Sequence, residues 1–222
     1  MLLRIELSPA TVRVDNTAVF QKSWYMTEIN APAPMYQNKA EETESYENEI
    51  SLEFNGRFLL MRVVTKDAIL RFSYRAVSGL PDGRGRRRQF DNSKERQAMV
   101  DEGPIPEGNY FIKPQEIQFT GDRDIIDTIN GVLGTRVGFG GTFPRGRLSW
   151  GIGRVWIYPR EVKVTRPSDG KVIKRGNFAI HGSRLRPGSR GCIDLTNNDR
   201  EFFDKLIEHR GDLTAIPLTV RY

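Results

Sequence analysis

The dipeptide Asn55-Gly56 and the two apolar runs beside it constrain the fold of this chain more than any other feature. The centre of a two-residue hairpin turn needs positive φ at both positions, which asparagine and glycine accept most readily. The run 50–54 alternates apolar and polar side chains, as a strand with one buried face does. We therefore predict an antiparallel hairpin from 50–54 and 57–64, with a third strand over 68–77.

The rest of the chain carries further β signals. Two prolines stiffen a turn at 103–108, and a second turn at 168–170 should lead from one strand into another. Short runs rich in branched and aromatic residues predict strands at 109–112, 154–158, 161–165, 178–181 and 217–222. The pattern predicts a mainly β domain with one or two peripheral helices.

Helix signals are fewer. Asn198 is the expected N-cap of a helix that ends at Gly211, with Glu201 completing a capping box three residues after the cap. Weaker patterns predict helices over 93–100 and 122–133. We expect these helices to lie at the edge of the β domain.

Residues 1–48 differ from the rest, with two short β-like runs followed by a stretch rich in proline and glutamate. Arg4 and Glu6 fall where a signal peptide needs apolar residues, so no Sec signal is expected. No run approaches 18 apolar residues, so no membrane span is expected either. The predicted domains are an arm or small subdomain of unknown role at 1–48 and a main domain at 49–222.

The formal net charge of +6 favours an anionic partner such as nucleic acid, anionic lipid or peptidoglycan. The basic block at 84–88 has no interleaved aromatic residues to stack bases, so a solvated loop is favoured over a nucleic-acid site. Charge therefore selects a class of partners, and the chemistry must come from other residues.

The chain has one cysteine, Cys192, and two histidines, His181 and His209. A single cysteine excludes an intrachain disulfide. Neither histidine has metal-ligand spacing to a second ligand, so we predict no metal site and no cofactor.

His181 and Cys192 are a candidate base and nucleophile. His181 ends an apolar strand directly before Gly182, and an offset of eleven residues lets the loop fold back to place the sulfur beside the imidazole. A thiol attacks as its thiolate, which needs a base or positive charge nearby. Three arginines on the intervening loop would favour the thiolate or bind a substrate carboxylate: Arg184, Arg186 and Arg190.

Gly191 lets a substrate approach the backbone closely, so the amides of Gly191 and Cys192 are candidate oxyanion-hole donors. Composition alone leaves open a plainer alternative, with Cys192 a buried hydrophobe and His181 a satisfied surface histidine. Other candidate substrate-binding residues, each with an alternative role in packing or loop shape, are Tyr74, Ser78, Ser183, Ser189 and Asp194.

The segment from His181 to Cys192 resembles the L,D-transpeptidase (YkuD-like) family, in which His-Gly leads through a spacer to Ser/Thr-His-Gly-Cys. It is most similar to the L,D-transpeptidase-like effectors of type VI secretion, which segments 74–79 (Tyr-Arg-Ala-Val-Ser-Gly) and 103–110 (Gly-Pro-Ile-Pro-Glu-Gly-Asn-Tyr) also resemble. The resemblance covers roughly residues 50–222.

Two departures from the family pattern bear on acceptor binding. Arg190 stands where the wider family has a histidine, and Asp194 where asparagine or arginine is common. His181 corresponds to the family's base, which a backbone carbonyl, here that of Gly182 or a near neighbour, would orient.

The resemblance implies a β-sandwich or barrel that performs acyl transfer without a metal or cofactor. The Cys192 thiolate would attack the diaminopimelate carbonyl of a tetrapeptide stem and release D-Ala, and His181 would move the proton. The resulting thioester would pass to water in a carboxypeptidase or to a D-amino acid in an exchange reaction.

The resemblance also implies an antibacterial effector, made in the cytoplasm without a Sec signal and acting in the periplasm of a target cell. Its partners would be peptidoglycan stem peptides, the type VI secretion machinery and a cognate immunity protein. The alternatives are a housekeeping L,D-transpeptidase that makes diaminopimelate crosslinks and a non-catalytic wall-binding or adaptor module. A nucleic-acid binder rests on charge alone.

Overall fold

The computed structural model describes residues 48–82, 89–121, 143, 146–184 and 187–222. By its internal contacts the chain divides into Met1–Thr43 and Glu44–Tyr222, and everything described here belongs to the second unit. The N-terminal arm up to residue 47, the basic block and the helix predicted at 122–133 lie outside the described residues.

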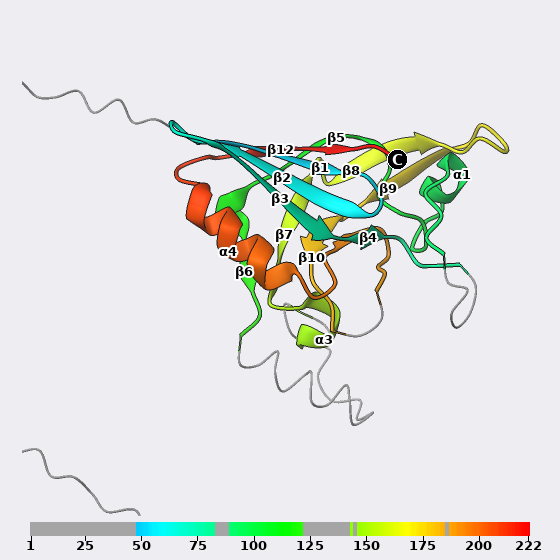
Figure 1. The fold of residues 1–222 in the computed structure, drawn as a ribbon. Helices are drawn as coiled ribbons and strands as arrows, with labels where there is room; N and C mark the ends of the chain where they lie inside the picture. Colours follow the sequence, from blue (N-terminus) through cyan, green and yellow to red (C-terminus); the bar gives the residue numbers. More distant parts are fainter. Residues whose placement is uncertain (1–47, 83–88, 122–142, 144–145, 185–186) are drawn as a thin grey trace, which may run out of the picture. The chain divides into compact units, whose positions relative to one another are not determined.

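In the described part of the chain, ten strands form one sheet, which confirms the mainly β fold (Figure 1). The strands are β1 (Glu49–Phe54), β2 (Phe58–Val64), β3 (Ile69–Arg75), β4 (Val77–Ser78), β5 (Gly108–Ile112), β6 (Gln118–Phe119), β7 (Gly153–Tyr158), β10 (Ala179–His181), β11 (Ile193–Asp194) and β12 (Ile216–Val220). Their order is β3-β2-β1-β12-β5-β7-β10-β11-β4, with β6 paired to β7. The two ends of this order, β3 and β4, are consecutive in the chain and separated by Ala76 alone, so the sheet curls round towards itself.

The predicted hairpin is confirmed as β1 and β2, which pair antiparallel with Phe54 opposite Leu59. Gly56 has a φ of 85°, and the Asn55 side chain accepts a hydrogen bond of 2.9 Å from the Phe58 amide. The third strand was predicted to run unbroken over 68–77, which is wrong. It breaks at fully buried Ala76, where the chain leaves one end of the sheet and enters the other.

The main core lies between this sheet and the helix α4 (Asp199–His209), which contributes three wholly buried apolar side chains: Phe202, Phe203 and Leu206. The helix was predicted correctly, but its capping box was not. Asn198 makes no side-chain capping bond, and its side-chain amide Nδ2 instead donates to the Arg75 carbonyl oxygen at 3.4 Å. Asn198 therefore links the start of α4 to the end of β3.

The strands β8 (Glu161–Thr165) and β9 (Val172–Gly176) form a separate two-stranded sheet. Its tip is tied to α1 (Lys94–Gln97), where the Ser168 hydroxyl donates to Glu95 at 2.8 Å. The predicted helix at 93–100 is thus present but shorter, and the Ser93 hydroxyl caps it by accepting from the Arg96 amide. Two short helices, η2 (Pro114–Glu116) and α3 (Gly146–Trp150), complete the described elements and were not predicted.

Among the described residues, no helix is both long and apolar enough to cross a membrane.

Candidate functional site

His181 is the last residue of β10, and strands on both sides fix its backbone. In the ladders it lies opposite Arg154 of β7 and Asp194 of β11. Its side chain is buried, with 5% of its surface exposed. The strand end predicted for His181 is therefore present, but the imidazole lies deeper than a surface histidine.

The orientation of the His181 ring is set by a single backbone carbonyl. Its Nδ1 atom lies 2.6 Å from the Gly182 carbonyl oxygen. A carbonyl oxygen can only accept, so Nδ1 must carry the hydrogen and Nε2 is the nitrogen left to act as a base. Gly182 thus has the orienting position that the sequence resemblance implied.

Cys192 immediately precedes β11 and is half-buried. The Cys192 Sγ atom lies 3.9 Å from the Asn177 carbonyl oxygen, and Cys192 lies near enough to His181 to raise the pKa of the imidazole. The fold therefore brings together the thiol and imidazole that lie eleven residues apart in sequence.

The electrostatics of His181 reflect two opposing effects. Burial lowers the pKa of the imidazole, whereas the hydrogen bond and negative charge of Cys192, with smaller contributions from Asp194 and Gly182, raise it, and the net effect is a raised pKa. An imidazolium beside a thiolate is the ionised pair that cysteine acyl transfer needs.

An aromatic wall adjoins the imidazole. The Trp150 ring centroid lies 5.0 Å from that of His181, at an interplanar angle of 52°. The buried Arg154 guanidinium stacks over Trp150 at 4.6 Å and over Trp156 at 4.3 Å. No signal in the sequence indicated the role of Arg154.

Gly191, just before the nucleophile, occupies a position that only glycine fits easily. Its φ is 114°, and an added Cβ would lie 2.8 Å from the Phe178 ring. Outside the strand ladders, neither the Gly191 nor the Cys192 amide hydrogen-bonds to a backbone carbonyl in the described residues. These two N–H groups therefore remain candidate oxyanion donors.

Ser78 is buried and hydrogen-bonds to the backbone of Gly191, so its hydroxyl does not face a substrate. It is 2% exposed, donates to the Gly191 carbonyl oxygen at 3.1 Å and accepts from the Ile105 amide at 2.9 Å. The predicted substrate-binding role is thus corrected to a bridge between the nucleophile's loop and the Pro-rich turn.

Asp194 organises the loop around Cys192. Its carboxylate is fully buried and accepts hydrogen bonds from the Ser183 hydroxyl at 2.9 Å and from the Gly188 and Thr196 amides at 3.0 and 2.8 Å. The Ser189 hydroxyl donates to the Cys192 carbonyl oxygen at 2.5 Å. Asp194 and Ser183 are therefore bound to each other, and Asp194 and Ser189 each bind the backbone of the loop.

Asp199, which sequence analysis missed, fixes Gly182. Its wholly buried carboxylate accepts from the Ile152 amide at 2.7 Å and pairs with Arg184 at 2.8 Å. A Cβ on Gly182 would lie 2.3 Å from this carboxylate. Arg184 is thus held by an ion pair, and the only available signal for Asp199 was an acidic residue at a helix start.

The remaining candidates for substrate binding are Tyr74, Arg190 and Arg186. Tyr74 is 1% exposed and packs edge-on against Phe202 at 5.4 Å, so the predicted substrate contact is wrong and the residue belongs to the core. Arg190 is exposed beside Cys192 and remains a candidate for substrate binding, while Arg186 lies outside the described residues. No group of three or more potential ligands that could hold a metal occurs in the described residues.

The solved structures that resemble the chain include the following two. One is that of Bdellovibrio bacteriovorus Bd1075, with 18% identity and a TM-score of 0.42, covering 80% of this chain and 49% of that one. The other is the helical cell shape determining protein Pgp2 from Campylobacter jejuni, with 18% identity and a TM-score of 0.41, covering 78% and 48%. This chain therefore spans about half the length of each. The comparison with curated proteins gave no match.

Residues 84–216, more than half of the 222 in the sequence, match the Tlde1 domain. The matched range includes both His181 and Cys192 and excludes β1 to β4. It confirms the expected likeness to effectors of type VI secretion. The chain belongs to the Tlde1 domain family, an L,D-transpeptidase-like family of type VI secretion effectors that modify peptidoglycan.

Proposed function

We propose that this chain is a cysteine L,D-carboxypeptidase and L,D-transpeptidase that acts on tetrapeptide stems of peptidoglycan. The observation that carries the proposal is the His181 imidazole, whose Nδ1 lies 2.6 Å from the Gly182 carbonyl oxygen and whose pKa is raised by the neighbouring Cys192. That arrangement leaves Nε2 to take the thiol proton, as acyl transfer requires. Family membership supplies the substrate class.

In the proposed reaction, His181 takes the thiol proton and the Cys192 thiolate attacks the diaminopimelate carbonyl. The oxyanion that forms is stabilised by the amides of Gly191 and Cys192. The bond to D-Ala then breaks, and imidazolium gives its proton to the departing amine, which leaves a thioester on the sulfur. Water or the amine of a D-amino acid, deprotonated by His181, releases the product and restores the thiol.

Arg190 is the exposed cation best placed to meet the substrate, because Arg184 is already paired with Asp199. We propose that Arg190 binds a carboxylate of the stem peptide. The biological setting proposed is delivery by type VI secretion into the periplasm of a rival cell, with an immunity protein protecting the producer.

The experiment measures D-Ala release from purified disaccharide-tetrapeptide by wild type and by Cys192→Ala and His181→Gln. Both variants should be folded, with release reduced by about 10³-fold or more, since removing a member of a nucleophile–base pair costs at least that much. Added D-amino acid should yield exchanged tetrapeptide with wild type alone. Release that persists in Cys192→Ala refutes the proposal, and dimer formation with sacculi would favour crosslinking over trimming.

A further inference from the structure

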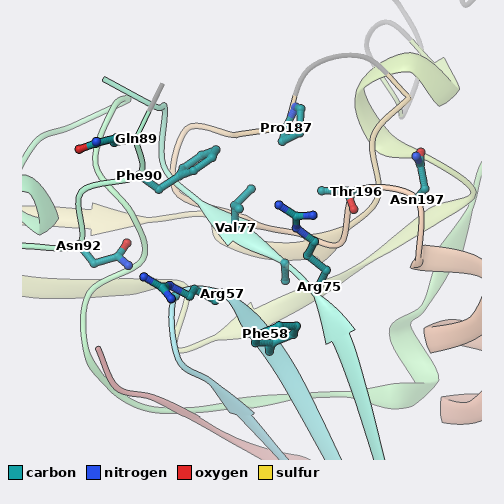
Figure 2. A pocket seen from close by; sticks show the side chains of 12 residues that line it. Arg57, Phe58, Arg75, Val77, Gln89, Phe90, Asn92, Pro187, Thr196 and Asn197 are labelled. Carbon is teal, nitrogen blue, oxygen red and sulfur yellow. The ribbon is translucent and has the colours of Figure 1, made fainter. Parts of the chain in front are cut away.

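A groove of about 1270 Å³ follows the junction of β3 and β4 (Figure 2). Cys192 is not among the residues that line it. Small-ligand pockets usually measure about 300–1,000 Å³, so this groove has room for a segment of a polymer. It is lined by Gly56, Arg57, Phe58, Arg75, Ala76, Val77, Gln89, Phe90, Asn92, Pro187, Thr196 and Asn197.

The groove carries positive charge, and no acidic residue occurs among the described residues that line it. Arg57 and Arg75 are both exposed, and in Figure 2 their side chains extend from the ends of β2 and β3 on the side of the groove away from Phe90 and Pro187. Within the described residues, neither guanidinium forms an ion pair, whereas Arg166 and Arg184 both do. Two exposed guanidinium groups that line one groove, without an ion-pair partner among the described residues, favour an anionic ligand with carboxylates bound in bidentate fashion.

The groove also offers an apolar face beside its positive charge. Phe58, opposite Arg75 in the strand ladder, leaves 42% of its surface exposed and offers an apolar face beside the charge.

The groove is connected to the nucleophile through one buried carboxylate. Pro187 and Thr196, on the groove wall, flank the segment that carries Cys192. Asp194 binds the Gly188 amide at 3.0 Å and the Thr196 amide at 2.8 Å, so it fixes the groove wall at both ends of this segment. A polymer bound in the groove would therefore lie against the loop that presents the sulfur.

We propose that this groove is a second binding site for the polymer substrate, which holds a carboxylate-bearing peptide outside the scissile stem through Arg57 and Arg75. The proposal rests on the function proposed above for its substrate class. It assigns the two arginines to binding of the polymer and gives them no part in bond cleavage.

The experiment measures binding in a background that cannot react. Soluble glycan chains carrying tetrapeptide stems would be titrated by calorimetry into Cys192→Ala protein, with and without Arg57→Gln and Arg75→Gln. Hydrogen bonds to charged groups are the strong ones, so the double change should weaken binding about tenfold or more. The matched control is Arg62→Gln with Arg71→Gln, a pair that lies directly opposite one another on the same two strands and outside the groove. This control should weaken binding by less than about twofold, because long-range charge is screened.

Glycan chains whose carboxylates have been amidated provide the second arm, and they should bind the parent Cys192→Ala protein at least as weakly as intact chains bind the double variant. Equal affinity for amidated and intact chains, or an equal loss in the control pair, overturns the proposal. Because binding is measured without turnover, its failure is distinct from failure of the proposed function, which D-Ala release by wild type from a short tetrapeptide tests separately.

Discussion

Replacing Ser78 by alanine should destabilise the protein by about 2–6 kcal/mol, because its hydroxyl serves two buried backbone groups at once. It accepts from the Ile105 amide at 2.9 Å and donates to the Gly191 carbonyl at 3.1 Å. Ser78 is 2% exposed and Ile105 is fully buried, so water does not replace the lost hydroxyl. A buried donor or acceptor left without a partner costs about 1–3 kcal/mol, and alanine strands one of each.

The measurement is urea denaturation of wild type and Ser78→Ala, read as a change in midpoint at constant slope. Ser73→Ala is the matched control, because Ser73 is exposed on β3 and should change stability by less than about 0.5 kcal/mol. D-Ala release should also fall in Ser78→Ala, mainly in kcat, because Gly191 loses the bond that positions it before the nucleophile.

The opposite pattern would refute this reasoning. If Ser78→Ala unfolds within about 0.5 kcal/mol of wild type and only its KM rises, the hydroxyl acts on substrate instead of on the backbone. The sequence-based expectation for this residue would then be right and the buried bridge unimportant.

Three further predictions concern the same site. Burial disfavours the His181 imidazolium, but Cys192 favours it, and the pKa of His181 is raised in the folded protein. The interactions of the imidazolium therefore stabilise the fold fully below about pH 6.5, and this stabilisation is lost as pH rises through the folded pKa. The stability advantage of wild type over His181→Gln should therefore shrink above about pH 6.5 in urea titrations, and an advantage that grows with pH would contradict it. Asp199→Asn should lower the free energy of unfolding by about 1–3 kcal/mol, because the ion pair with Arg184 is lost. The same substitution in an Arg184→Gln background should lower the free energy of unfolding by less. Gly191→Ala should abolish D-Ala release, because its φ of 114° and the nearby Phe178 ring exclude a Cβ, whereas Gly170→Ala, with open space around it, should retain it.

Local signals predicted much of the fold, and they failed where a distant contact decided the outcome. The hairpin at Asn55-Gly56 and the helix ending before Gly211 follow from turn chemistry and periodicity. The break at Ala76 does not, because it depends on β3 and β4 joining opposite ends of the sheet. The local sequence likewise predicts that Asn198 is an N-cap, yet its side-chain amide donates to the Arg75 carbonyl oxygen, 123 residues away in sequence.

In the candidate site, too, some residues could be predicted from local signals and others depended on distant contacts. Cys192, His181 and Gly182 carry reactive or conformational signals in sequence, and their mutual placement agrees with the prediction. Polar residues near them were expected to face substrate, and two of them, Ser78 and Asp194, face backbone groups instead. A sequence shows that a polar side chain is present, but only the packed chain shows which buried donor or acceptor needs it.

The region that defines the family is not a self-sufficient unit in this chain. It spans residues 84–216, yet β11, which follows the nucleophile directly, has β4 as its outer neighbour, and β5 pairs with β12, of which only Ile216 lies within the match. A chain cut to 84–216 would leave two sheet edges unpaired and remove the Ser78 bridge to Gly191. The strands before residue 84 therefore complete the catalytic loop as well as the sheet, so the oxyanion geometry proposed here depends on residues outside the family match.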